Sequence, residues 1–274
     1  MLVTLLLAAP LLAPAAAPCP PTAGPVPSAR RGADEVETVE IETSDKLTLT
    51  GDYWAPRRKS GRSPAALLVH DAGGDRHELA RIGERLQKQG FAVLAIDLRG
   101  HGNSRADGMD WKTLDADKRE KLWVFATRDL DAAAAWLRER REVHATNLNL
   151  VGMGAGCTLA VKHAGRDGNV RSLVLLQPPT EKFGFDLEGD ILEIEGLPTL
   201  AVAAKTKRAV AENLVSVANG DGARPWVELD LRAKVSDGLL DDRKLPAEVA
   251  RWMQDKAEPK RGASEGDAQD RGRS

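Results

Sequence analysis

The chain has 274 residues, which suits one compact domain with extended ends, and 42% are hydrophobic but only 4% aromatic, so we expect an aliphatic core of leucine, valine and alanine. Lysine and arginine number 39 against 41 aspartate and glutamate, and the net charge is −2. That balance gives no electrostatic reason to expect nucleic acid or an anionic membrane surface as a partner.

The first 17 residues are almost wholly apolar and end in small side chains, which is typical of a cleavable export signal, although no basic residue precedes the apolar run. An uncleaved anchor is the alternative, but the run is short and contains proline, which disfavours a membrane span. Cys19 could carry a lipid anchor, yet Pro18 before it argues against lipidation. We therefore expect a secreted, periplasmic or cell-envelope protein with no integral span after signal cleavage.

The chain then divides by composition. Residues 18–33 form a proline-rich linker, residues 34–256 carry the folded domain, and residues 257–274 predict a disordered, charged tail. The only two cysteines, Cys19 and Cys157, have no spacing that favours a disulfide, and no cluster of cysteine and histidine has zinc-binding spacing. We expect no metal and no other cofactor.

Within residues 34–256, two β-type stretches at 36–41 and 47–54 precede a regular alternation of apolar runs and amphipathic helices. Buried strands are expected at 65–70, 91–96, 148–151, 170–176, 200–204 and 226–231. Helices are expected at 78–88 and 118–141, after the 148–151 strand through Val161, and around Val249, Trp252 and Met253. This order predicts a mostly parallel sheet covered by helices on both faces. Residues 177–197 leave room for a lid loop or one helix, but not for a cap domain.

Three segments between the strands and helices carry recognisable motifs. Residues 67–78 have the sequence LLVHDAGGDRHE, residues 91–104 FAVLAIDLRGHGNS, and residues 147–164 NLNLVGMGAGCTLAVKHA. The third is a strand, a glycine-rich turn and a helix. A phosphate-binding loop is the alternative for that turn, but it would need a third glycine at Cys157, and no Walker lysine follows.

In this order the three segments resemble the α/β-hydrolase fold family, in particular its dienelactone hydrolase and serine aminopeptidase types. The resemblance implies a nucleophile elbow at 152–156 and an oxyanion hole formed by backbone N–H groups near Ala72 and Ala155. It also implies architectural roles for Asp97, Arg99 and His101. We expect the oxyanion region of the cleft to include His70, Asp71, Ala72, Met153, Gly154 and Ala155.

The same resemblance implies that each member of the catalytic triad is missing. Gly154 occupies the nucleophile position, Lys207 the position of the acid and Asp237 the position of the base. No histidine follows His163, although the fold orders its triad as nucleophile, acid and histidine along the chain. Cys157 could be a displaced nucleophile, but it lies three residues beyond Gly154 in the first turn of a helix, where a small buried hydrophobe is expected.

Three functions follow from these observations. The first is an exported, non-catalytic protein that binds a small molecule or an envelope protein through the former active-site cleft. The second is an active hydrolase of ester or amide substrates that uses unrecognised residues, and the third is a structural module of the cell envelope. With carboxylates at Asp71 and Asp237 and a cation at Lys207, we expect the cleft to favour neutral or cationic ligands over carboxylates.

Overall fold

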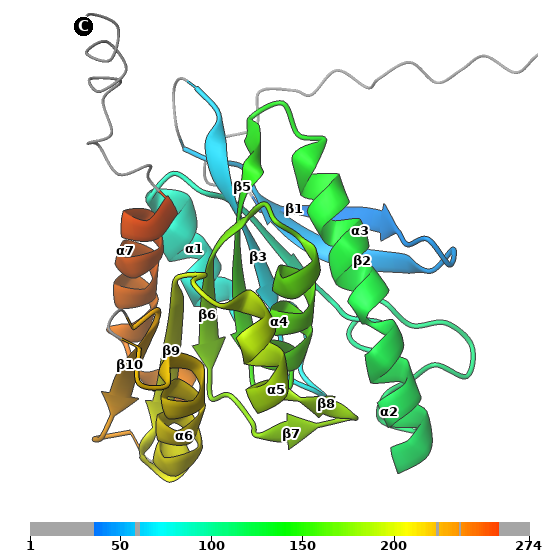
Figure 1. Cartoon of the computed structure of the whole chain (residues 1–274). Helices are drawn as coiled ribbons and strands as arrows, with labels where there is room; N and C mark the ends of the chain where they lie inside the picture. Colours follow the sequence, from blue (N-terminus) through cyan, green and yellow to red (C-terminus); the bar gives the residue numbers. More distant parts are fainter. Residues whose placement is uncertain (1–35, 58–60, 223–224, 236, 258–274) are drawn as a thin grey trace, which may run out of the picture. The chain divides into compact units, whose positions relative to one another are not determined.

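A computed structural model describes residues 36–57, 61–222, 225–235 and 237–257 (Figure 1). The expected signal peptide at 1–17, the linker at 18–33 with Cys19, and residues 258–274 of the expected tail lie outside the described residues. Ala257, which was assigned to the tail, is instead the last residue of a helix. In the described part of the chain, no helix is both long and apolar enough to cross a bilayer.

Eight strands form one twisted sheet in the order β1-β2-β4-β3-β5-β6-β9-β10 (Figure 1). The strands are β1 (Val36–Glu42), β2 (Thr48–Trp54), β3 (Ser63–Val69), β4 (Ala92–Ile96), β5 (Val143–Met153), β6 (Val170–Leu176), β9 (Thr199–Ala204) and β10 (Val227–Arg232). Strand β2 is antiparallel to β1 and β4, and every other neighbouring pair is parallel. The expected mostly parallel sheet is confirmed.

Helices cover both faces of the sheet, as the apolar character of its strands requires. Helices α1 (Ala80–Lys88) and α7 (Leu245–Ala257) pack together on one face. The other face carries α3 (Thr127–Arg138), α4 (Gly156–Arg166), α5 (Leu187–Ile191) and α6 (Arg208–Asn219), seen at the front of Figure 1. Successive residues of β3 point into the two separate cores, since Leu67 belongs to one and Leu68 to the other.

The single helix expected at 118–141 is wrong, because the chain forms α2 (Ala116–Phe125) and then α3. The Ala126 N–H donates to both Leu122 O (3.1 Å) and Trp123 O (3.0 Å), which tightens the last turn of α2 before the chain continues. Trp123 and Leu130 are both buried, so the apolar stripe is continuous across the break. An apolar stripe of this kind predicts which residues are buried, but it does not reveal where one helix ends and the next begins.

The segment expected to hold the lid contains a small hairpin, β7 (Glu181–Lys182) and β8 (Phe185–Asp186), followed by α5 and a 3₁₀ turn, η1 (Leu192–Ile194). Phe183 and Gly184 form its tip with φ of 51° and 77°, the geometry of a tight hairpin turn that few side chains tolerate. Phe183 packs edge-on against Trp111, with ring centroids 5.2 Å apart, and lies 5.3 Å from the ring of Trp123. These contacts anchor the hairpin to the domain.

The core is mostly aliphatic, but it is not only aliphatic. Trp111 and Trp123 are 7% and 1% exposed, and their ring centroids lie 5.5 Å apart. His101 stacks against Trp111 at 4.6 Å. Trp111, Trp123 and Phe183 therefore form an aromatic cluster between the hairpin and the loop that follows β4, where their large rings fill the space.

Candidate active-site cleft

The elbow predicted at residues 152–156 is a sharp turn between β5 and α4. Gly154 lies at its apex with φ of 52°, and its N–H donates to Leu176 O at 2.8 Å. A Cβ added at Gly152 would lie 2.8 Å from Cys157 Cα, and one at Gly156 would lie 2.5 Å from His70 O. Glycine is required at both flanking positions because strand, turn and helix meet backbone to backbone.

The apex of the turn is not empty space. A Cβ added at Gly154 would overlap all three atoms of the Asp71 carboxylate. Asp71 follows β3 in the chain and is half-buried. The volume in which a nucleophile side chain would begin is therefore filled by a carboxylate from the neighbouring loop.

The same carboxylate occupies the two backbone donors that the resemblance identified. Asp71 Oδ1 accepts from Ala72 N and from Ala155 N, each at 2.7 Å. These two N–H groups do converge on one point, as expected for an oxyanion hole, but a side-chain oxygen of the protein already lies at that point. Asp71 was expected beside these two donors, but its hydrogen bonds to both of them were not predicted.

Glu78 holds the backbone of Asp71 in place. Its Oε2 accepts from Asp71 N at 2.7 Å, and the Gly74 N–H donates to Asp71 O at 3.0 Å. Burial raises the pKa of the Glu78 carboxyl, and the nearby negative charge of Asp71 raises it further. The loop that carries Asp71 is thus fixed at its backbone as well as at its side chain.

An open cleft of about 720 Å³ lies over the elbow. The described residues that line it are Asp71, Met153, Gly154, Ala155, Gln177, Pro179, Thr180, Glu181, Lys182, Lys207, Val210 and Asp237. The structure therefore brings Gly154, Lys207 and Asp237 to one cavity, from the elbow, from the 3₁₀ turn η2 (Lys205–Lys207) after β9, and from the loop after β10. Lys207 and Asp237 are exposed, and Asp237 Oδ1 accepts from Thr206 Oγ1 at 2.6 Å.

Two residues expected in the oxyanion region, His70 and Ala72, do not line the cleft. His70 is 1% exposed, its Nδ1–H donates to Asp71 O at 2.6 Å, and its Nε2 accepts from Leu98 N at 3.0 Å. Burial lowers the pKa of this imidazole, so the neutral ring is a structural link between β3 and β4. Ala72 contributes its backbone N–H to Asp71 only.

Gln177 is a residue of the cleft that sequence reasoning missed. It has a φ of 55°, unusual for glutamine, and its N–H donates to Val202 O at 2.8 Å. Its Oε1 accepts from Ala204 N at 3.1 Å, and its Nε2 donates to Asp237 O at 3.2 Å. Gln177 thus joins the end of β6 to the end of β9 and to the loop that carries Asp237. No local sequence signal distinguishes it from any glutamine after a strand.

Cys157 is fully buried beneath the elbow. Its Sγ–H donates to Gly152 O at 3.3 Å and to Leu176 O at 3.5 Å, and burial raises the pKa of the thiol well above its usual range. Nucleophilic cysteines need an accessible, readily formed thiolate. The geometry gives Cys157 the properties of a packing residue.

The motif at 91–104 connects neighbouring loops through hydrogen bonds and ion pairs. Asp97 accepts from Arg76 N and Asn103 N, both at 2.8 Å. Arg99 is buried and pairs with Asp129 at 2.7 Å and with Asp45 at 2.9 Å. These contacts serve architecture, because none of Asp97, Arg99 or His101 lines the cleft.

His101 supports the loop that carries Asp71. Its Nε2 accepts from Gly73 N and its Nδ1–H donates to Arg99 O, each at 3.0 Å. Burial, with the neighbouring His70 as a second cause, lowers the pKa of His101 to about 4. Both ring nitrogens are therefore used in the neutral form.

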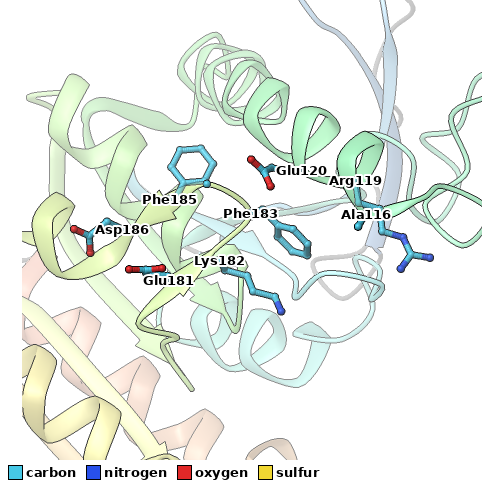
Figure 2. A pocket seen from close by; sticks show the side chains of 9 residues that line it. Ala116, Arg119, Glu120, Glu181, Lys182, Phe183, Phe185 and Asp186 are labelled. Carbon is cyan, nitrogen blue, oxygen red and sulfur yellow. The ribbon is translucent and has the colours of Figure 1, made fainter.

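A second hollow of about 510 Å³ lies on the other side of the β7–β8 hairpin. Figure 2 shows its side chains, which come from α2 (Ala116, Arg119, Glu120) and from hairpin residues 181–186. Glu181 and Lys182 line this hollow and the cleft alike, so the hairpin is a wall shared by both. Within the described ranges, no group of three histidine, cysteine, aspartate or glutamate side chains could hold a metal ion.

Known protein families include one whose sequence pattern this chain matches. The model of the dienelactone hydrolase family matches residues 51–196, which run from β2 through the elbow to the lid segment. The chain belongs to the dienelactone hydrolase family. The resemblance found in its three motifs is thereby confirmed, and so is the fold class.

Solved structures place this dienelactone hydrolase family member in the α/β-hydrolase fold. An esterase from Pyrococcus furiosus superposes with a TM-score of 0.63 at 17% identity, covering 82% of this chain and 92% of that one. A dienelactone hydrolase from Anabaena variabilis gives a TM-score of 0.60 at 17% identity over 82% and 97% of the two chains. An α/β hydrolase from Penicillium gives 0.64 at 14% identity over 81% and 99%.

Two curated relatives, both uncharacterized proteins of Mycobacterium tuberculosis, are 32% identical over 141 residues. The match covers 52% of this dienelactone hydrolase family member and 45% of each relative, so the chain spans about half the length of those proteins.

Proposed function

We propose that this protein is an exported, non-catalytic member of the dienelactone hydrolase family that binds a small molecule or a protein partner through its cleft. The observation that carries the proposal is the apex of the elbow. Gly154 supplies no side-chain oxygen or sulfur there, and the Asp71 carboxylate fills the space that such a side chain would need. Acyl transfer through a covalent intermediate requires a nucleophile at that point.

The remaining walls of the cleft support the same proposal. Among its described lining residues, none is serine, cysteine or histidine. Thr180 has a hydroxyl, but a threonine hydroxyl is a weak nucleophile unless a general base activates it, and no histidine is among the described lining residues. Both oxyanion donors are engaged by Asp71, so neither is free for a developing negative charge. The cleft retains the shape of an active site and lacks its reactive groups.

The first test is chemical. We expect the purified full-length protein to show no labelling by a fluorophosphonate probe and no turnover of short p-nitrophenyl esters above buffer. A Cys157→Ser variant serves as the matched control and should behave as wild type, because Cys157 is buried and its thiol pKa is raised. Labelling that maps by mass spectrometry to any residue of the wild-type protein would overturn the proposal and establish the alternative, an active hydrolase.

The second test concerns export, which rests on the apolar, small-residue composition of residues 1–17. We expect fractionated cells to hold the protein outside the cytoplasm and its mass to lack the apolar segment. A variant with Leu5→Arg and Leu6→Arg should stay in the cytosol at full length, because charge interrupts the apolar run. Wild-type protein recovered full length in the cytosol would contradict export.

A further inference from the structure

Asp71 has one oxygen engaged and one available. Its Oδ1 takes both the Ala72 and the Ala155 N–H groups, at 2.7 Å each. Among the described residues none donates a hydrogen bond to Oδ2, and Asp71 lines the cleft. The two N–H bonds hold the carboxylate in one orientation, so its second oxygen is an acceptor held in a fixed position above Gly154, in a residue that lines the cavity.

The charges around this acceptor favour a cation. Three carboxylates line the cleft, from Asp71, Glu181 and Asp237, against the two ammonium groups of Lys182 and Lys207. Lys182 Nζ lies 5.0 Å from the centre of the Phe183 ring and thus contacts an aromatic face of the hairpin. An entering carboxylate would find both N–H donors already engaged and a negative charge beside them.

We propose that Asp71 determines the specificity of the cleft, which accepts a ligand through a primary ammonium group and excludes carboxylates. This inference rests on the proposed ligand-binding function. An ammonium group has three donors and full positive charge, so it can form a charge-assisted hydrogen bond to Asp71 Oδ2. Gly154 makes this possible, because any side chain there would displace the Asp71 carboxylate.

The ammonium group could belong to a small amine or to a lysine side chain of a polypeptide. The experiment separates these sources with two cationic probes, n-butylammonium and the amide of Nα-acetyl-lysine. Butyrate and n-butanol are the matched anionic and neutral probes of similar length. Each is titrated into ¹⁵N-labelled full-length protein at constant pH and ionic strength, and the amide signals of Ala72 and Ala155 are followed.

We expect at least one cationic probe to shift the Ala72 and Ala155 amide signals saturably, while butyrate and n-butanol do not. Asp71→Asn keeps the size of the side chain and removes its charge, so ammonium affinity should fall about 10-fold or more. As the matched control, Asp107→Asn removes an exposed carboxylate that does not line the cleft and should change affinity less than about 3-fold, since exposed charges interact weakly. Binding of n-butylammonium alone indicates a small amine, and comparable binding of the lysine amide indicates a polypeptide.

Asp71→Ala tests the exclusion of anions separately. Without the carboxylate, the Ala72 and Ala155 N–H groups are free, and butyrate should now shift both signals while n-butylammonium no longer does. The inference is overturned if butyrate shifts these signals in the wild type as much as ammonium does, or if Asp71→Asn binds ammonium as tightly as the wild type. Asp71→Asn retains the side-chain acceptor for both N–H groups, so its result stands even if Asp71→Ala fails to fold. Fluorophosphonate labelling would refute the proposed function without changing these titrations.

Discussion

Four substitutions made together, Asp71→Gly, Gly154→Ser, Lys207→Asp and Asp237→His, should give measurable turnover of p-nitrophenyl acetate. The variant that carries only the last three should be inactive, although it contains all the residue types of the triad. A serine Cβ at position 154 would overlap the Asp71 carboxylate, so the new side chain and Asp71 cannot both keep their positions. In addition, Asp71 Oδ1 accepts from both N–H groups of the proposed oxyanion hole, those of Ala72 and Ala155.

The expected difference in turnover between the two variants is large, because the Asp71 carboxylate both overlaps a serine Cβ at position 154 and engages both N–H donors. Loss of a single oxyanion donor typically lowers kcat by about 10²–10³, and in the three-substitution variant both donors are engaged. The control is the four-substitution protein with Gly154→Ala in place of Gly154→Ser, which removes Asp71 without adding a hydroxyl. Equal turnover by the three- and four-substitution variants would show that Asp71 moves aside without cost, and the interpretation of it as an obstacle would be wrong.

Acidification should weaken the domain through His101. The pKa of His101 is lowered to about 4 in the fold, against an ordinary value of 6.5. Between these two pH values the unfolded chain binds a proton at this site and the folded chain does not, so stability is lost as pH falls from 6.5 to 4. The loss from this one group is about 1.4 kcal/mol for each pH unit, or about 3 kcal/mol in all.

Urea unfolding of the wild type and of His101→Gln, compared at pH 7 and at pH 4.5, measures that contribution. Most other groups titrate alike in both proteins, so the difference between their pH slopes reports on His101 together with its interaction with His70, whose ring centroid lies 4.9 Å away. We expect the free energy of unfolding to fall by about 2 kcal/mol less in His101→Gln than in the wild type. Identical slopes would mean that His101 is protonated in the folded protein and that the hydrogen bond from Gly73 N to its Nε2 does not form.

The central strands β3, β4, β6 and β9 were predictable because burial on both faces forces them to be apolar over most of their length. The parallel edge strand β10 is only partly buried and instead alternates apolar and charged residues. The elements that were missed have weaker local signals. Helix α6 buries only Ala211, Leu214 and Ala218, and the β7–β8 hairpin has strands of two residues. The break at Ala126 was invisible because the buried stripe continues through it.

The candidate site, like the fold, could be predicted from the sequence only in part. The fold's order of elements was enough to predict that positions 154, 207 and 237 meet in one cleft, because loops at the carboxyl ends of parallel strands lie on the same edge of a sheet. The position of the Asp71 side chain could not be predicted from the sequence. It depends on the missing Cβ of Gly154, which lies 83 positions further along the chain. A contact between two loops, such as that of Asp71 with Gly154, forms only when the fold brings the loops together, so it leaves no local signal in the sequence.

The contacts of Gln177 bear on the rates at which a ligand would bind to the cleft and dissociate from it. Its left-handed backbone costs about 1–2 kcal/mol for a residue with a side chain, and its hydrogen bonds to Val202, Ala204 and Asp237 offset that cost during folding. The side of the cleft formed by the ends of β6 and β9 and by the Asp237 loop is therefore held together without a ligand, and it has little entropy left to lose on association. Under the proposed function, binding needs no slow rearrangement on this side, so ligands of different fit should differ chiefly in their dissociation rates.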